Sequence, residues 1–178
     1  MVTHSRSSVY HGAARRGGIR AAFVGLVVAL AIAHATDARA QQSEDATTSG
    51  VEIVMRALSF LGVPYRLGGE DPARGFDCSG LVRYVVDLAL GLDLPRRSEA
   101  MRKMGHSVTG GPLAPGDLLF FNTLGRPFSH VGLYIGDGRF VHAPARGGQV
   151  RIESMQIPYW RKRFNGARRV SPVDDGPA

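Results

Sequence analysis

The residue best suited to chemistry in this 178-residue chain is Cys78, its single cysteine. One cysteine cannot form an internal disulfide, so the thiol needs another role. The hydrophobic pattern predicts a helix that begins at Cys78. Unpaired amides at a helix N-terminus favour a thiolate, which is the reactive form of a thiol, and can hold a developing oxyanion. The alternative is a small buried core residue, which is common for free cysteine.

A nucleophilic thiol also needs a base and a group that orients the base. His130 begins a predicted strand over residues 130–135, and His142 lies in the next one, over residues 139–143. A lone histidine in a β-strand is more often a hydrogen-bonded core residue than a catalytic residue. A cysteine at a helix start together with two histidines on one hairpin predicts instead a nucleophile (Cys78), a base (His130) and an orienting group (His142).

The hairpin between the histidines determines whether they can meet. If residues 136–138 form a three-residue loop, His142 faces Gly132 and lies on the same sheet face as His130, as its diagonal neighbour. A two-residue turn at Asp137-Gly138 would place the two histidines on opposite faces. We therefore predict the three-residue loop.

The elements that must position these residues follow from hydrophobic periodicity and turn residues. A helix is predicted from Val51 to Gly62 with Ser49 as its N-cap, and a Gly- and Pro-rich loop leads from it to Asp77. Helices are predicted at 78–90 and 98–104, and strands at 117–121, 130–135, 139–143, 149–153 and 164–170. Helices followed by strands indicate an α+β fold with the cysteine-bearing helix packed on an antiparallel β-sheet.

The N-terminus has the order of segments typical of a secretory signal peptide. Arginines come first, then the apolar run from Ala21 to Ala33, then Ala38-Arg39-Ala40. The run of about 13 residues is shorter than the roughly 20 that span a bilayer, so a permanent anchor is the weaker interpretation. We expect a signal peptide at 1–40, a flexible lead-in at 41–50, one catalytic domain at 51–170 and a flexible tail at 171–178.

The net charge of the chain restricts which classes of binding partner are expected. The formal net charge of +7 falls to about +3 once the leader is removed, which is too small to indicate nucleic-acid binding. A mildly basic mature protein would be attracted to an anionic polymer such as a cell wall. We expect an exported, periplasmic or extracellular monomer with no stable membrane anchor and no cofactor.

Several segments, in order along nearly the whole mature chain, resemble the NlpC/P60 family of papain-like cell-wall peptidases. They are GVPYRLGG (62–69), FDCSGLVRYV (76–85), LPR (94–96), LAPGDLLFF (113–121), SHVGLYIGDGRFVHAP (129–144) and PYWRKRFNGARRV (158–170). One difference is that many relatives continue after LPR with Thr-Ser and later Gln, where this chain has Arg97-Ser98 and Met101. If this segment contacts substrate, we expect this chain to prefer a different stem peptide from those relatives.

The resemblance implies thiol-dependent hydrolysis of peptidoglycan stem peptides, at the bond between γ-D-glutamate and the diamino acid. It assigns the nucleophile to Cys78, the base to His130 and the third polar position to His142. It also places Tyr65 beside the nucleophile as an aid to the oxyanion site, and Asp77, Ser79 and Ser129 along the substrate groove. The simpler interpretations are a core aromatic for Tyr65 and a helix N-cap for Asp77.

Three alternatives remain open. The same cysteine and histidines would serve an N-acetylmuramoyl-L-alanine amidase or an acyltransferase of related fold. A zinc site made of Cys78, His130 and His142 would lack both a nearby carboxylate base and closely spaced ligand pairs, so we predict no metal. A non-catalytic wall-binding module is disfavoured because all three catalytic positions are filled.

Overall fold

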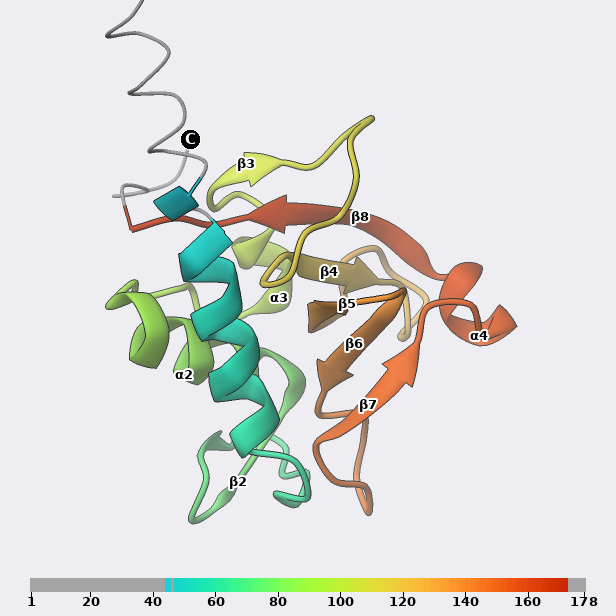
Figure 1. Ribbon diagram of the computed structural model, residues 1–178. Helices are drawn as coiled ribbons and strands as arrows, with labels where there is room; N and C mark the ends of the chain where they lie inside the picture. The colour runs from blue at the N-terminus through green and yellow to red at the C-terminus, as the bar shows by residue number, and fades with distance from the viewer. Residues whose placement is uncertain (1–43, 46, 173–178) are drawn as a thin grey trace, which may run out of the picture. The chain divides into compact units, whose positions relative to one another are not determined.

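An antiparallel sheet of six strands is the largest element of the computed structural model, which describes residues 44, 45 and 47–172. The strand order is β3-β8-β4-β5-β6-β7, as seen from top to bottom in Figure 1. These strands are His106–Ser107, Phe164–Arg169, Leu118–Phe121, His130–Gly136, Arg139–His142 and Arg151–Ser154. A second, two-stranded sheet pairs β1 (Glu70–Asp71) with β2 (Gly75–Phe76). The α+β fold class predicted from the sequence is confirmed.

The helices begin and end for identifiable local reasons. Residues 47–59 form the first helix, which is already present before Val51, so Ser49 lies inside the helix and the predicted N-cap is wrong. The second, α2 (Cys78–Leu90), begins where the Asp77 side chain accepts from the Gly80 N–H, and it ends at Gly91 with φ 68°. Two single-turn helices complete the set, α3 (Ser98–Met101) and α4 (Pro158–Arg161).

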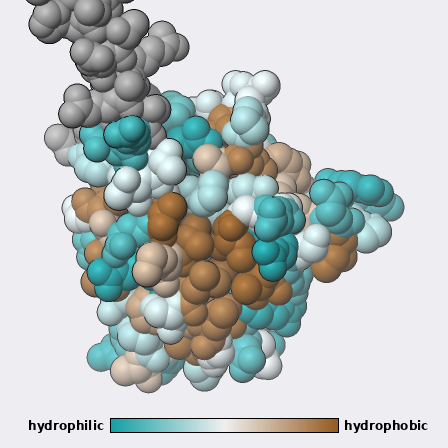
Figure 2. All heavy atoms as spheres, viewed as in Figure 1, coloured by the Kyte–Doolittle hydropathy of each residue, from teal (hydrophilic) through white to brown (hydrophobic). Residues whose placement is uncertain are grey.

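The sheet carries a different apolar cluster on each face. On one face Leu118, Phe120, Val131, Leu133 and Val141 pack with the first helix and α2 to form the main core. On the other face Leu119, Phe121, Phe140 and Ala167 pack under Trp160 of α4. Figure 2 shows hydrophobic residues gathered in the middle of one side of the molecule, where the first helix meets the sheet. Alternation along each strand separates the two clusters, as the pleat requires.

The hairpin between β5 and β6 has a different turn from the one predicted. Gly136 pairs with Arg139 across a two-residue turn, Asp137-Gly138, and both turn residues have positive φ. The register shifts between Tyr134 and Gly136, so one residue bulges out of β5. The predicted three-residue loop is therefore wrong. Because the bulge adds one residue, it restores the parity that a two-residue turn would have broken.

Some sequence-based expectations concern residues that the structure does not describe. The predicted leader at 1–40 lies outside the described part of the chain, as does most of the predicted tail at 171–178. Among the described residues, no helix is both long enough and apolar enough to cross a membrane. Within the described residues, the sheet, its helices and the site belong to one compact unit.

Candidate active site

A cavity of about 560 Å³ opens at the N-terminal end of α2. Six of the seven residues predicted for the site line it, namely Tyr65, Asp77, Cys78, Ser79, Ser129 and His130. The seventh, His142, lies behind His130 rather than in the cavity wall. Segments far apart in the sequence thus meet at one concave surface, as expected of a ligand site.

Cys78 is the first residue of α2 and is partly exposed. Burial and the adjacent Asp77 carboxylate raise the pKa of its thiol, although the backbone N–H groups of Val131, Ser79 and Cys78 itself act in the opposite direction. The N–H groups at the helix start thus lower this pKa, as expected, but burial outweighs them and the net pKa is raised. The effect of Val131 also places the thiol close to the backbone that directly follows His130. At neutral pH the resting thiol is protonated and needs a base.

The two histidines form a buried hydrogen-bonded pair. His130 Nε2 and His142 Nδ1 are 2.8 Å apart, and the two rings are perpendicular. The register of the hairpin accounts for this contact. Leu133 faces Val141, so the next pair away from the turn is Gly132 and His142, and His130, two residues before Gly132, lies on the same sheet face as His142. His130 Nε2 is thus engaged by His142, so Nδ1 is the ring nitrogen of His130 that this contact leaves free, and His130 itself lines the cavity.

Aromatic rings cover the pair, and both histidine rings lie on the sheet face opposite α2. Trp160 of α4 stacks on His130, with ring centroids 5.5 Å apart, and meets the His142 ring edge-on at 4.9 Å. Burial lowers the pKa of each histidine to about 3, helped for His130 by the neighbouring His142 and for His142 by Arg151. Both rings are therefore neutral at physiological pH, and a neutral imidazole can accept a proton.

Gly132 allows the histidines to approach each other. A Cβ at this position would lie 2.9 Å from the Val141 carbonyl oxygen, 2.8 Å from Phe140 Cδ2 and 3.2 Å from His142 Cβ. Any side chain here would displace the strand that carries His142. A glycine at position 132 is thus explained by the space that the neighbouring strand β6, which carries His142, needs.

Asp77 is more heavily bonded than a free substrate ligand would be. Its carboxylate caps α2 at Gly80 N, accepts from Gly68 N and accepts two bonds from Arg96 at 2.6 and 3.1 Å. Burial alone would raise the pKa of Asp77, but the hydrogen bonds from Arg96 and Gly80 outweigh it and lower the pKa below its usual value. The same guanidinium donates to Ser79 Oγ. Asp77 and Ser79 therefore shape the start of α2, which agrees with the simpler interpretation of Asp77.

Tyr65 and Ser129 occupy two other parts of the cavity wall. Burial raises the pKa of Tyr65, and the nearby Cys78 and Asp77 add to the effect, so the phenol keeps its proton and can donate a hydrogen bond. The Ser129 hydroxyl accepts from the backbone N–H groups of Thr123 and Leu124 and thereby holds the loop between β4 and β5. The main role of the Ser129 hydroxyl in this structure is thus to fix the conformation of that loop.

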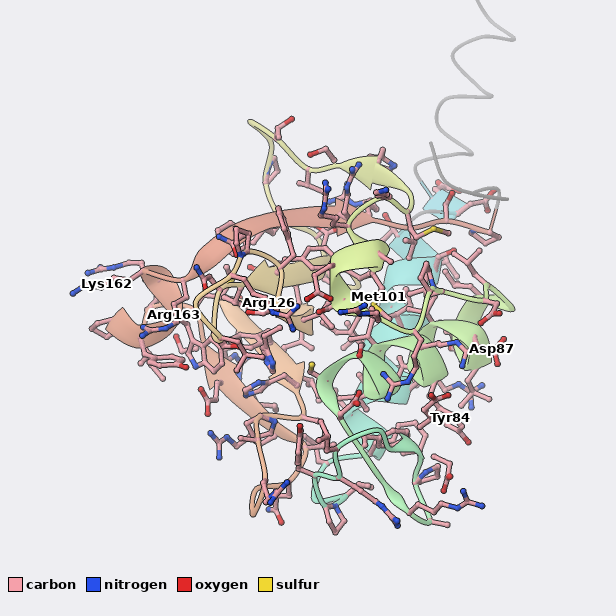
Figure 3. The ribbon with its side chains drawn as sticks, turned by 180° about the vertical axis from the view of Figure 1, so that it is seen from behind. Tyr84, Asp87, Met101, Arg126, Lys162 and Arg163 are labelled. Atoms are coloured by element: carbon pink, nitrogen blue, oxygen red, sulfur yellow. The ribbon has the colours of Figure 1, made fainter. Side chains whose placement is uncertain are left out.

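Arginines dominate the rim of the cavity. Arg97, Arg126 and Arg146 line it together with Arg96, against two lining carboxylates, Asp77 and Glu99, and Glu99 is 2.7 Å from Arg126. Figure 3 shows Arg126 on its loop next to α3. The segment in which the chain differs from many relatives thus reaches the cavity through Arg97, whereas Met101 is fully buried in the core.

The basic residues of the C-terminal segment 158–170 do not line the cavity. In the basic C-terminal segment, Arg163 lies over the Tyr159 ring at 3.8 Å and Arg169 pairs with the buried Asp117 at 2.7 Å. Lys162 points away from the body of the protein (Figure 3). Within the described residues, no three His, Cys, Asp or Glu side chains are grouped so that they could hold a metal ion.

Comparison with known proteins places this site in a family. The model of the NlpC/P60 family matches residues 62–169. The chain belongs to this family. Among curated NlpC/P60 relatives, the gamma-DL-glutamyl hydrolase of Bacillus subtilis is 43% identical over 126 residues, covering 70% of this chain and 30% of that protein. The murein DD-endopeptidase MepS/murein LD-carboxypeptidase of Escherichia coli K12 is 48% identical over 109 residues, covering 61% and 56%.

Solved NlpC/P60 structures agree with the fold described here. The NlpC/p60 domain of the peptidoglycan hydrolase SagA is similar with a TM-score of 0.59 and 34% identity, covering 67% of this chain and 97% of that one. A family member from Bacillus cereus ATCC 10987 has a TM-score of 0.64 and 33% identity, covering 69% and 40%. The chain spans between about a third and just over half of the length of the curated relatives named above.

Proposed function

We propose that this protein is a cysteine peptidase that hydrolyses peptidoglycan stem peptides, with Cys78 as nucleophile, His130 as base and His142 as the group that orients the base. The observation that carries the proposal is the buried 2.8 Å contact between His130 and His142, next to a cavity that His130 shares with the thiol at the start of α2. Membership of the NlpC/P60 family supports it, since relatives are named murein endopeptidases and peptidoglycan hydrolases.

The chemistry follows from the protonation states. Because the resting pair is a thiol and a neutral imidazole, His130 Nδ1 takes the thiol proton as Sγ attacks the carbonyl carbon of the peptide. The backbone N–H at the start of α2 and the Tyr65 hydroxyl hold the oxyanion. His130 then gives its proton to the leaving amine, which leaves a thioester. Water then attacks the thioester carbonyl carbon as His130 accepts one of its protons. The C–S bond breaks, His130 returns that proton to Sγ, and the acid product leaves and ionises in water.

We further propose that the bond cleaved joins γ-D-glutamate to the diamino acid. One relative is named a gamma-DL-glutamyl hydrolase, and another is named a DD-endopeptidase and LD-carboxypeptidase, so the competing bond is the D-alanyl cross-link. The arginine-rich rim supports a substrate that carries several free carboxylates, as stem peptides do. Asp77, Ser79 and Ser129 border the groove on this proposal and hold its walls in place.

Digestion of defined stem-peptide fragments, with products identified by mass, tests both proposals. We expect wild type to leave L-Ala-γ-D-Glu on the sugar side. An amidase would leave no amino acid on the sugar, and cleavage of the cross-link would separate two intact stems. Cys78→Ala should lower kcat by at least about 10³-fold, whereas Ser59→Ala, an exposed change on the first helix, should not. Lytic activity retained in Cys78→Ala would remove the nucleophile assignment.

We propose that the protein acts outside the cytoplasm, in the periplasm or beyond. The support is the order of basic, apolar and small residues at 1–40 and the location of peptidoglycan itself. On this proposal the envelope fraction contains a mature protein that begins at Gln41, which N-terminal sequencing detects. An uncleaved N-terminus in that fraction would contradict it.

A further inference from the structure

One ring nitrogen of His142 has no hydrogen-bond partner within the described part of the chain. The side chain is fully buried, and its Nδ1 is occupied by His130 Nε2. Its Nε2 bonds to no atom among the residues that the structure describes. A buried polar atom left in this state costs about 1–3 kcal/mol, so its surroundings should explain it.

Glu153 of β7 lies directly in front of this nitrogen. Its Oε1 is 3.7 Å from His142 Nε2. The register accounts for the position, because His142 faces Arg151 and Phe140 faces Glu153, so all four side chains share the sheet face opposite α2. Sequence reasoning missed Glu153 because that face could be recognised only once the β6–β7 register was known.

The Glu153 carboxylate is held from both sides. Arg151 Nε donates to Oε1 at 2.6 Å, and Trp160 Nε1 donates to Oε2. Trp160 also covers both histidine rings. The indole therefore fixes the carboxylate and at the same time excludes water from the histidine pair, which strengthens electrostatic effects between them.

A carboxylate at this place determines which nitrogen of His142 carries the proton. With a hydrogen on Nε2 the ring presents an N–H to Glu153, whereas the other tautomer would direct a lone pair at a negative charge. When Nε2 is protonated, Nδ1 is an acceptor, so His130 Nε2 must donate and His130 Nδ1 has a free lone pair. The opposite tautomer would place a hydrogen on His130 Nδ1, which could not then take the thiol proton.

We propose that Glu153 is a positioning residue that holds His142, and through it His130, in the tautomers needed for base catalysis. This inference rests on the proposed role of His130 as the base. As His130 takes up a proton, the positive charge is shared along the hydrogen bond towards His142. The carboxylate then stabilises it from the far side, as the acid of a catalytic triad does.

Two measurements test the role of Glu153. In Glu153→Gln we expect kcat for stem-peptide hydrolysis to fall about ten- to a hundredfold with little change in KM, and Glu153→Asp to recover part of it. The matched control is Glu52→Gln, which removes an exposed carboxylate that pairs only locally with Arg56. An unchanged kcat in Glu153→Gln would overturn the inference.

The second measurement is independent of turnover. Nitrogen NMR of the histidine rings should show both His142 and His130 protonated at Nε2 in wild type. Glu153→Gln should move proton occupancy towards Nδ1, and wild-type tautomers in a folded Glu153→Gln would overturn the inference. If that variant does not fold, the same spectra of Glu153→Asp decide. Loss of the proposed peptidase function would appear separately, as a wild type with the expected tautomers that cleaves no stem peptide.

Discussion

At the scale of single residues, Asp77 is the acidic residue next to Cys78. Its hydrogen bonds show that it stabilises the start of α2. Its carboxylate accepts a hydrogen bond from the backbone N–H of Gly80, in the first turn of α2, and two hydrogen bonds from Arg96. Arg96 also donates a hydrogen bond to Glu70. A carboxylate with this many donors has little capacity left for the amine of a substrate. The chain Glu70–Arg96–Asp77 instead links the loop at β1 to the helix that carries the nucleophile.

The Asp77 assignment can be tested by stability. Asp77→Ala removes the cap of α2 and leaves the Arg96 guanidinium without its main partner, so the free energy of unfolding should fall by about 2–4 kcal/mol. Asp77→Asn keeps an acceptor for Gly80 N and should lose less than half of that amount. Urea unfolding measures both. Unchanged stability in both variants, with a KM raised about tenfold, would show that the carboxylate serves the substrate instead.

At the scale of elements, the hairpin β5–β6 decides whether the base and its orienting group meet. The Asp137-Gly138 turn alone would put His130 and His142 on opposite faces, and the bulged residue in β5 compensates for it. The close approach of the two strands then depends on Gly132, where a Cβ would contact both Phe140 and His142.

Gly132→Ala should therefore damage stability and activity together. The added methyl meets backbone and ring atoms at 2.8–3.2 Å, so we expect a loss of about 1–3 kcal/mol in unfolding free energy and a lower kcat as His142 is pushed away from His130. Gly111→Ala is the matched control, because a Cβ there meets nothing within 4 Å and Gly111 is not among the glycines with positive φ. Thermal unfolding and peptide hydrolysis measure both effects. Equal behaviour of the two variants would contradict the packing argument.

The same hairpin shows what the sequence could and could not predict. Periodicity located α2 and the five longer strands, and the choice of a loop that puts both histidines on one face gave the correct Gly132–His142 register from a wrong turn. A bulge has no distinct local signal, so the turn could not be chosen from the residues alone. Glu153 and Trp160 belong to the site through non-local pairing of β6 with β7 and the packing of α4, which no spacing in the sequence records.

At the scale of the whole molecule, the site imposes a cost on stability in acid. Two buried neutral histidines have folded-state pKa values of about 3, against 6.5 for an ordinary histidine. Below pH 6.5 the unfolded chain binds protons at these positions and the folded protein does not, so the equilibrium moves towards unfolding as pH falls. Asp77, whose pKa is lowered, loses its stabilising contribution only at pH values below its ordinary one of 3.8. Between pH 6.5 and about 4 the histidine effect therefore acts without the Asp77 effect.

The histidine pair should thus make the protein markedly less stable at pH 5.5 than at pH 7.5. Because both folded-state pKa values lie well below 5.5, the two rings together should lower the unfolding free energy from urea titration by roughly 3 kcal/mol between these pH values. His142→Asn removes one of the two titrating groups and should reduce the difference by about half, while the exposed His106→Gln should leave it as in wild type. Equal stability of wild type at the two pH values would mean that the folded protein accepts protons at His130 and His142. The carboxylate of Glu153, 3.7 Å from His142, would then be the partner that admits them.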